Sequence, residues 1–472
     1  MPSLVLCEEL VNLYFRYIHD TFHSLFHRPS LIEDVRSGSI PQVLLLGIIS
    51  LAARFSNDRF FNNTDPRTRG RPYATEAALL LDLRDVSVTT IQGSVLLGAF
   101  AITEGESEAE SIYYSIACRL AMLMDLPNMP VVSRLEQETN LRTWWTLNMV
   151  DVWSSNGVGL PRSIRSRHDV PYPMEEIVYL RMRREDYDAP SPTAMEESSA
   201  SLLTQMVKLN AILFEVSELN RVAIMGDTFT PSMTAFEYDA SVDRLGQKLD
   251  DWYTNIPSRL KDTPENLEYF AQYGLGYVFV AVYLGYYHYG QLLYYQYLDE
   301  NIFAEEFAQN APLAVRAEQY ADKCKSYSTA LCGILYRAYS TAGCEVYYTM
   351  VGHVLVVAST IQLFILLFSA SELDTTLARK RLEHNFEILT RLQQYWPTLD
   401  VSFNKFREFH DACLREGQNE SNFRMDRWMM QFLFEFARPA TKRENARNAN
   451  GGWQHRSFDS AMESPTLMHT SI

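Results

Sequence analysis

The hydrophobic residues of this chain recur at helical spacing along nearly every long segment, and the alternating pattern of strands is scarce. The apolar residues between Leu4 and Phe26 follow this spacing, and Pro29 is expected to end their helix because its ring cannot donate the helical hydrogen bond. A second helix is expected to start at Pro41. The same pattern runs through residues 107–126, 133–153, 198–225, 235–255, 269–298, 314–340, 344–371, 374–395 and 402–437. These segments predict an all-α multi-helix bundle.

Two of the predicted helices begin with the spacing of a capping box, in which a hydroxyl and a carboxylate each satisfy a free backbone amide. The pairs are Ser107 with Glu110 and Ser133 with Glu136. Both pairs stand directly before an apolar run. The sequence therefore predicts that helices start at these two serines.

Changes in composition mark two joints along the chain. Residues 157–197 contain five prolines and many charges, which indicates an extended connection between two helical halves. From Arg438 the chain becomes polar and too poor in apolar residues to offset the entropy of ordering. Residues 438–472 are therefore predicted to be a disordered tail.

Composition excludes some classes of protein. The 472 residues are 47% hydrophobic and 21% charged, which excludes a wholly disordered chain. The formal net charge of −16 opposes contact with phosphate backbones, and no large basic patch stands out. The small basic clusters at Arg67, Arg69 and Arg71 and at residues 379–381 are interpreted as solvated positions, with nuclear import as the alternative. The six cysteines lack zinc-cluster spacing and are expected to be buried free thiols.

One stretch, residues 346–371, is long and apolar enough to span a bilayer. It also contains His353, Ser359, Thr360 and Gln362, and no cluster of basic residues flanks it closely. We expect a buried core helix and no membrane contact.

Two patterns are compatible with chemistry, and neither is complete. His19, His23 and His27 would share one helix face, but the glutamate and the further ligand of a zinc site are missing. Residues 250–251 are two aspartates that begin like the magnesium-binding motif of terpenoid-type enzymes, whose third carboxylate is absent here. The chain also lacks a Gly-x-Ser-x-Gly elbow, a phosphate-binding loop and a His-Glu-x-x-His motif. No catalytic, cofactor-binding or metal-binding residue is predicted, and the protein is expected not to be an enzyme.

A set of segments in a fixed order resembles the regulatory, or middle homology, domain of fungal binuclear-zinc-cluster transcription factors of the xylanolytic-activator type. Residues 14–31 include the stretch His27-Arg28-Pro29, and residues 43–53 and 89–97 follow, the latter with Gln92. Residues 116–121 resemble the family's A-x-R-x-A helix, with Arg119. Residues 141–164 are similar to its most specific signature, which is built on Arg142, Trp144, Trp145, Asp151, Gly159 and Pro161.

The roles expected of these motif residues are structural. Trp144 and Trp145 are expected to anchor the core. Arg119 and Arg142 are expected to pair with Asp151 inside the bundle, since a buried charge must find a partner. The turn from Gly159 to Pro161 is expected to close the helix.

The resemblance implies a regulatory domain over residues 8–260, followed by a C-terminal helical region over residues 261–437 that packs on it. It also implies a nuclear regulator of transcription by RNA polymerase II. Members of the family read DNA through an N-terminal cluster of six cysteines that binds two zinc ions, and Cys7 is the only cysteine near the start of this chain. DNA is therefore expected to be reached only through a missing or partner module, and no cofactor is expected in this chain. A small-molecule effector, a homodimer and other transcription regulators remain open as partners. The alternative is an all-α small-molecule-binding protein or terpenoid-type enzyme.

Overall fold

Helices form every regular element of the computed structural model in the part that it describes, which comprises residues 2–165, 167, 169–185, 199–225, 233–298 and 310–417. This confirms the predicted all-α class. The α-helices are α1 (Leu4–Tyr17), α2 (Arg28–Ser37), α3 (Gln42–Ala52), α4 (Arg71–Leu80), α5 (Val88–Glu104), α6 (Ser107–Leu123), α7 (Arg134–Val158), α8 (Glu176–Arg181), α10 (Leu202–Met225), α11 (Ala235–Asn255), α12 (Pro264–Gln272), α13 (Gly276–Tyr294), α15 (Ala311–Ser340), α16 (Met350–Phe368), α17 (Glu372–Gln393) and α18 (Leu399–Gly417).

Helix α1 is shorter than its hydrophobic pattern predicts. It ends at Tyr17, and the chain then turns through Asp20, whose φ of 64° is left-handed. The side chain of His19 stabilises the turn, because its Nε2 atom accepts the backbone N–H groups of Leu25 and Phe26 over 3.0 and 3.1 Å. Residues 18–27 therefore form a loop although their apolar residues keep helical spacing.

The prediction of three histidines on one helix face is consequently wrong. His23 lies in the same loop and shares a hydrogen bond of 2.9 Å with the hydroxyl of Tyr14, while His27 occupies the N-cap position of α2. Within the described residues, no group of three or more His, Cys, Asp or Glu side chains is arranged to hold a metal ion.

Pro29 starts a helix instead of ending one. It stands in the first turn of α2, where the missing N–H would have no partner in any case. Helix α3 follows after Pro41 as predicted, and the residues of α3 from Leu44 to Ala52 are all buried.

One of the two predicted helix caps is present. The Ser133 hydroxyl accepts the Glu136 N–H, and the Glu136 carboxylate accepts the N–H of Val132, so α7 begins as expected. The predicted cap of Ser107 and Glu110 is wrong, because Glu106 is the N-cap of α6 and makes no side-chain cap bond. The Glu110 side chain points into the core, where it is 2% exposed.

Two further segments differ from their predicted extents. The segment predicted as one helix over residues 269–298 is divided between α12 and α13 at Gly274, whose φ of 70° interrupts the helical path. The connection predicted over residues 157–197 contains the short helix α8. Its residues 186–198 lie outside the described residues, as does the predicted tail over residues 438–472.

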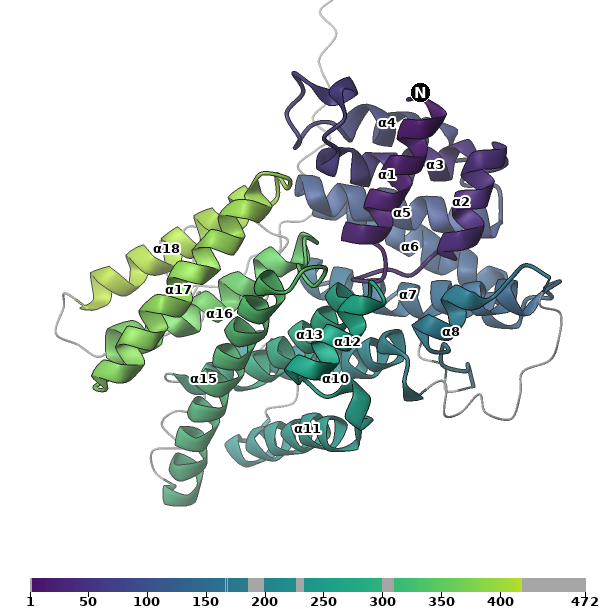
Figure 1. Ribbon diagram of the computed structural model, residues 1–472. Helices are drawn as coiled ribbons and strands as arrows, with labels where there is room; N and C mark the ends of the chain where they lie inside the picture. The colour runs from purple at the N-terminus through teal and green to yellow at the C-terminus, as the bar shows by residue number, and fades with distance from the viewer. Residues whose placement is uncertain are drawn as a thin grey trace, which may run out of the picture. The chain divides into compact units, whose positions relative to one another are not determined.

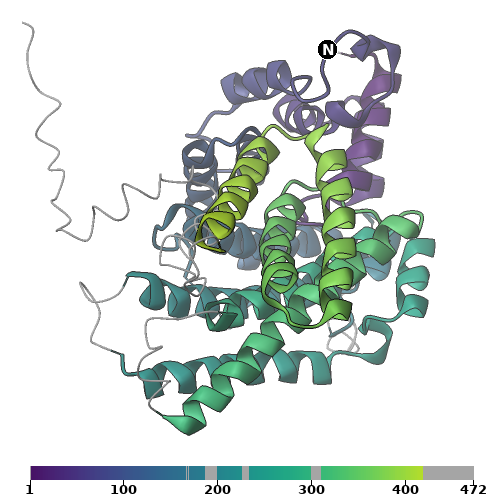
Figure 2. The same cartoon turned by 90° about the vertical axis from the view of Figure 1, so that its left-hand side faces the viewer.

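The described helices belong to one compact unit, in which α7 connects the early and later helices. Helix α7 contacts α5 and α6 on one side and α10 on the other, and α10 leads through α13 to α15 and α16 (Figures 1 and 2). Long-range contacts return to the N-terminal helices. The Tyr277 hydroxyl donates to the carbonyl of Phe15 over 2.7 Å, and the buried Arg54 donates to the carbonyl of Tyr395 over 2.7 Å. The domain boundaries expected at residues 260 and 437 stay predictions.

Helix α16 combines the length and composition of a membrane span with a buried position. Its apolar window has a mean hydropathy of 2.2, and 72% of that window is buried within the chain. Helices α13, α15, α17 and α18 surround it. The helices over residues 28–37 and 42–55 are bent relative to each other. They would also be long and apolar enough to cross a membrane if they formed one span. The expectation that residues 346–371 form a buried core helix is confirmed for α16.

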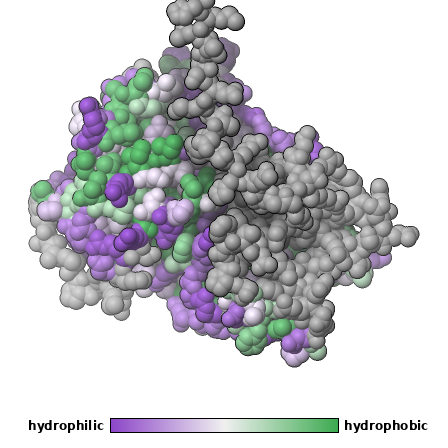
Figure 3. Space-filling view, turned by 180° about the vertical axis from the view of Figure 1, so that it is seen from behind, coloured by the Kyte–Doolittle hydropathy of each residue, from purple (hydrophilic) through white to green (hydrophobic). Residues whose placement is uncertain are grey.

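Apolar residues also remain on the surface. On the described part of the face seen from behind, hydrophobic residues gather in a patch beside hydrophilic ones (Figure 3). The exposed large apolar side chains include Leu79, Leu80, Leu83 and Val86 in and after α4. The described surface therefore contains exposed apolar side chains as well as charged ones.

Candidate functional site

Helix α7 is the element on which the predicted motif residues converge. Trp144 and Trp145 are 2% and 8% exposed, so both are core residues as expected. The Trp145 indole also donates to the carbonyl of Pro171 over 2.8 Å, which holds the loop after the helix against it. Because α7 is buried on most of its circumference, its polar side chains must find partners inside the protein.

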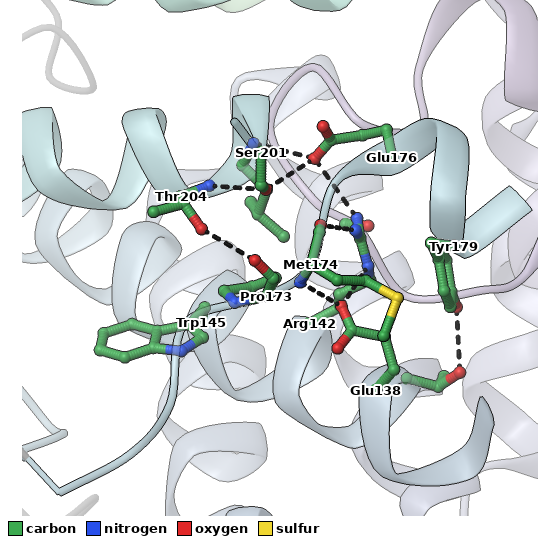
Figure 4. A network of polar contacts seen from close by, with 12 residues as sticks. Glu138, Arg142, Trp145, Pro173, Met174, Glu176, Tyr179, Ser201 and Thr204 are labelled. Atoms are coloured by element: carbon green, nitrogen blue, oxygen red, sulfur yellow. Dashed lines mark hydrogen bonds and ion pairs between the residues drawn. The ribbon is translucent and has the colours of Figure 1, made fainter. Parts of the chain in front are cut away.

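Arg142 is the centre of a buried polar network (Figure 4). Its side chain is 1% exposed, and its Nε atom donates to the Glu138 carboxylate over 3.0 Å. Its Nη2 atom donates to the backbone carbonyl of Met174 over 2.6 Å, and Nη1 lies 3.6 Å from the carboxylate of Glu176. The ring centroid of Tyr179 lies 4.2 Å from the guanidinium carbon. One arginine therefore connects α7 to the loop before α8 and to α8 itself.

Glu176 extends the network to the start of α10. Its carboxylate accepts the Ser201 hydroxyl over 2.9 Å and the backbone N–H groups of Leu202 and Leu203 over 2.8 and 3.1 Å. A carboxylate at this position satisfies free amides and is favoured by the helix dipole. In addition, the Thr204 hydroxyl donates to the carbonyl of Pro173 over 3.1 Å, as Figure 4 shows.

The charges of the network are removed from water. Burial raises the pKa of Glu138 to about 7, although the guanidinium of Arg142 opposes this shift. Glu138 also accepts the Met174 N–H over 3.0 Å, so its carboxylate holds the loop as well as the arginine. Groups that share such a network depend on one another, because removing one partner leaves another buried charge uncompensated. The arrangement is suited to positioning α7, α8 and α10.

Asp151 holds the loop that follows α7. Its carboxylate accepts the backbone N–H groups of Ser163 and Ile164 over 2.8 and 3.1 Å and the Arg162 Nε–H over 3.2 Å. Gly159 ends the helix with a φ of 70°, a conformation that glycine adopts without steric cost. The turn from Gly159 to Pro161 therefore closes α7 as predicted.

The predicted ion pairs of Asp151 are wrong. Arg119 is exposed on α6, and Arg142 pairs with Glu138 and Glu176 instead. A carboxylate that already accepts two backbone amides and Arg162 does not need either arginine.

The remaining motif residues hold the N-terminal loop. Gln92 donates to the carbonyl of Leu25 over 2.8 Å. The Nδ1 atom of His27 shares a hydrogen bond of 2.8 Å with the Ser30 hydroxyl, and its ring lies 5.0 Å from that of Tyr179. These contacts bring the loop against the Arg142 network.

Arg28 and Pro29 are exposed at the start of α2. Arg28 donates to the side-chain oxygen of Asn12 over 3.1 Å, so it connects α2 to α1 at the surface. Neither residue reaches the buried network through a described hydrogen bond.

Three members of the network were not predicted as site residues. Glu138 stands four positions before Arg142, a spacing that places opposite charges on one helix face and that reveals the pair in the sequence. Glu176 and Tyr179 come from a segment more than thirty residues away, and no local pattern connects them to Arg142.

The two aspartates of the incomplete magnesium-binding motif lie at the surface. Asp250 and Asp251 are exposed on α11, where Asp250 lies 3.7 Å from Lys323 and Asp251 accepts the side-chain amide of Gln247. This position gives no support to the terpenoid-type alternative.

Most side chains of the two basic clusters contact other parts of the protein. Arg67 pairs with Asp400, Arg69 donates to the carbonyl of Ser56 over 2.8 Å, and Arg71 lies 2.8 Å from Glu104. In the second cluster, Arg381 contacts the amide oxygen of Gln362 over 3.4 Å. Nuclear import, the alternative interpretation of these clusters, stays a prediction.

Comparison with known proteins identifies the region that carries these contacts. Residues 11–254, slightly more than half of the chain, match the family described as the fungal specific transcription factor domain. The Arg142 network, the Asp151 contacts and the N-terminal loop all lie inside this match. No solved structure matches the chain.

The relatives are proteins of fungi. An uncharacterized transcriptional regulatory protein of Schizosaccharomyces pombe is 26% identical over 199 residues, which cover 38% of this chain and 20% of the relative. A second protein of that description from the same organism is 22% identical over 434 residues, which cover 85% of this chain and 52% of the relative. A Zn(2)-C6 fungal-type transcription factor of Fusarium oxysporum is 24% identical over 211 residues, which cover 41% and 22%. The chain thus spans between one fifth and about half of the length of these relatives.

Proposed function

Because this chain belongs to the family of the fungal specific transcription factor domain, we propose that it is the regulatory part of a fungal transcription regulator that acts in the nucleus. The observation that carries the proposal is the match over residues 11–254, which also confirms the resemblance drawn from the sequence. The relatives described as transcriptional regulatory proteins and transcription factors support it.

The structure is consistent with a positioning role for the motif residues. Arg142, Asp151 and Gln92 use their side chains to fix backbone segments to one another. Residues of this kind maintain the shape of a domain and do not act on a substrate. We therefore propose that the protein is not an enzyme.

DNA recognition is proposed to reside in a separate module, either of the same polypeptide or of a partner. The net charge of −16 disfavours phosphate contact by these 472 residues. A small-molecule effector, a second copy of the chain and other regulators are proposed as the inputs that such a domain integrates.

A reporter experiment tests the regulatory role. The full chain is fused to an unrelated DNA-binding domain, and transcription is measured from a reporter that carries the matching DNA site in fungal cells. We expect a severalfold change in transcription relative to the DNA-binding domain alone, in either direction. Equal reporter output at equal nuclear amounts of both proteins would contradict the proposal.

A second experiment tests the proposed separation of DNA binding. The purified chain is analysed for zinc by mass spectrometry and for duplex binding by gel shift at several salt concentrations. We expect neither stoichiometric zinc nor sequence-specific binding at physiological salt. Tight sequence-specific binding by these residues alone would show that the DNA-reading surface lies within them.

A further inference from the structure

An open groove of about 690 Å³ lies between α16, α17 and α18. Its walls are mainly apolar and include Leu363, Leu366, Leu382, Phe386, Phe403 and Phe406. Phe386 remains 37% exposed although its ring centroid lies 5.1 Å from that of Phe406. Apolar walls that stay open to solvent are typical of a binding surface.

The chain leaves α18 beside this apolar surface. Helices α17 and α18 are joined by residues 394–398 and diverge from that junction, and both pack on α16, so α18 flanks the groove along one side (Figure 2). The connection between α16 and α17 lies at the other end of α17. The helix ends on either side of it carry the exposed side chains of Leu367 and Phe368 in α16 and of Leu373 and Leu377 in α17.

The sequence that follows α18 has the pattern of an amphipathic helix. Polar residues recur at Arg424, Arg427, Gln431 and Glu435. The positions between and beside them are apolar except for Asp426, and comprise Met425, Trp428, Met429, Met430, Phe432, Leu433, Phe434 and Phe436. The spacing of three and four gathers the four polar residues into one stripe of a helix, so that most of the remaining helix surface is apolar. An apolar face of this kind requires cover from another surface.

We propose that the groove between α16, α17 and α18 is the docking site of the chain's own segment over residues 423–436. The lengths permit it. From Arg407 at the groove to Gly417 at the end of α18 the helix rises by about 15 Å, at about 1.5 Å per residue. The six steps from Gly417 to Phe423 span up to about 20 Å when extended. A helix of fourteen residues is about 21 Å long, enough to run back along the groove.

The tether also favours this occupant over a second copy of the chain. A segment joined by a short linker is present at an effective concentration in the millimolar range, so it competes well with any molecule that must arrive from solution. The proposal does not depend on the role in transcription, since it concerns only which surface covers the groove.

Hydrogen exchange of the full chain, followed by mass spectrometry, tests the docking. In the wild-type protein we expect the amides of residues 423–436 to exchange at least about tenfold more slowly than an unstructured peptide. The substitution Phe386→Asp places a charge on the wall of the groove and should remove most of this protection. The matched control Ile112→Asp, at a position of α6 that is 60% exposed, should leave the protection unchanged.

A second pair of variants keeps the groove itself intact. Leu433→Asp changes the apolar face of the segment and should abolish its protection, whereas Gln431→Asp changes the polar face and should not. The amides of α17 should keep their wild-type exchange in both variants, which shows that the helices remain folded.

Three results would overturn the proposal. The first is exchange of residues 423–436 at the rate of an unstructured peptide in the wild type. The second is protection that persists in both Phe386→Asp and Leu433→Asp, since the segment would then be covered elsewhere. The third is protection that disappears on dilution together with a dimer seen by light scattering, because the occupant would then be a second copy.

Discussion

The Nη1 atom of Arg142 lies 3.6 Å from the carboxylate of Glu176, and both side chains are buried. Arg142 belongs to α7, whereas Glu176 begins α8 and accepts the first amides of α10. Because these elements are separated along the chain, the pair joins parts of the fold that are distant in sequence. The stability of this region therefore depends on a small number of buried charges.

Removal of Arg142 is the direct test of this dependence. Arg142→Ala leaves Glu138 and Glu176 buried without their cation, and breaking a buried pair costs about 3–5 kcal/mol. We expect a loss of this size in the free energy of unfolding measured with urea. The control Arg119→Ala removes an exposed arginine and should change stability by no more than about 0.5 kcal/mol. Equal losses in the two variants would show that the network contributes nothing specific.

The tryptophans of α7 make a separate prediction. Trp144→Ala leaves a cavity in the core and should lower the free energy of unfolding by about 3–5 kcal/mol. Leu160→Ala, at an exposed position just after the same helix, serves as the control and should have little effect. A melting temperature of Trp144→Ala equal to that of the wild type would refute its role as a core anchor.

The pattern of apolar residues was sufficient to predict the fold class and most helices. Residues 235–255 form α11 with the predicted bounds, because the capping box of Thr234 and Glu237 and the apolar face of the helix are both local in sequence. The end of α1 could not be predicted in this way. The side chain of His19 takes the amides of Leu25 and Phe26, and this contact exists only in the folded loop.

The candidate site shows the same limit. The pair of Glu138 and Arg142 is local and follows from helical spacing, whereas Glu176 reaches Arg142 only through the path of the intervening loop. The mistaken pairing of Asp151 with Arg119 has a similar cause. The sequence shows that a buried carboxylate needs donors, but backbone amides such as that of Ser163 supply them without any signal in residue type.

Glu110 predicts a dependence of stability on pH. Its side chain is buried in α6, and burial raises its pKa from an ordinary 4.5 to about 8. The folded protein therefore binds this proton more tightly than the unfolded chain, so Glu110 makes stability fall as pH rises from about 4.5 to about 8. Glu110→Gln should remove this fall and should be more stable than the wild type at pH 8, measured as the urea midpoint.

The comparison between wild type and Glu110→Gln separates the effect of Glu110 on the pH dependence of stability from the effect of the buried histidines. Burial lowers the pKa of His23 and of His288 to about 3. These two histidines therefore make the stability of the folded protein fall as pH drops below about 6.5, and this effect is equal in the wild type and in Glu110→Gln. Glu108→Gln, at an exposed position two residues earlier in α6, is the control. If the difference between Glu110→Gln and wild type does not change between pH 5 and pH 8, Glu110 does not titrate in this range.

The packing of α13 on α15 gives the last prediction, which depends on one glycine. A Cβ atom at Gly290 would lie 2.5 Å from the ring of Tyr327, closer than real Cβ contacts allow. That ring is also stacked on Tyr294 at 6.1 Å, so it has little room to move. Gly290→Ala should therefore destabilise the protein by about 1–3 kcal/mol, as overpacking does.

Gly333 of α15 is the matched control for this substitution, because only the flexible end of Arg337 lies near its added Cβ, at 3.7 Å. Alanine has the higher helix propensity, so Gly333→Ala should be neutral or stabilising by up to about 1 kcal/mol. The two variants make the same chemical change within helices that contact each other, and urea denaturation of both compares them directly. Opposite signs would show that the space at Gly290 sets the approach of α13 to α15. A stabilising effect at both positions would contradict this explanation, since helix propensity alone would then account for the result.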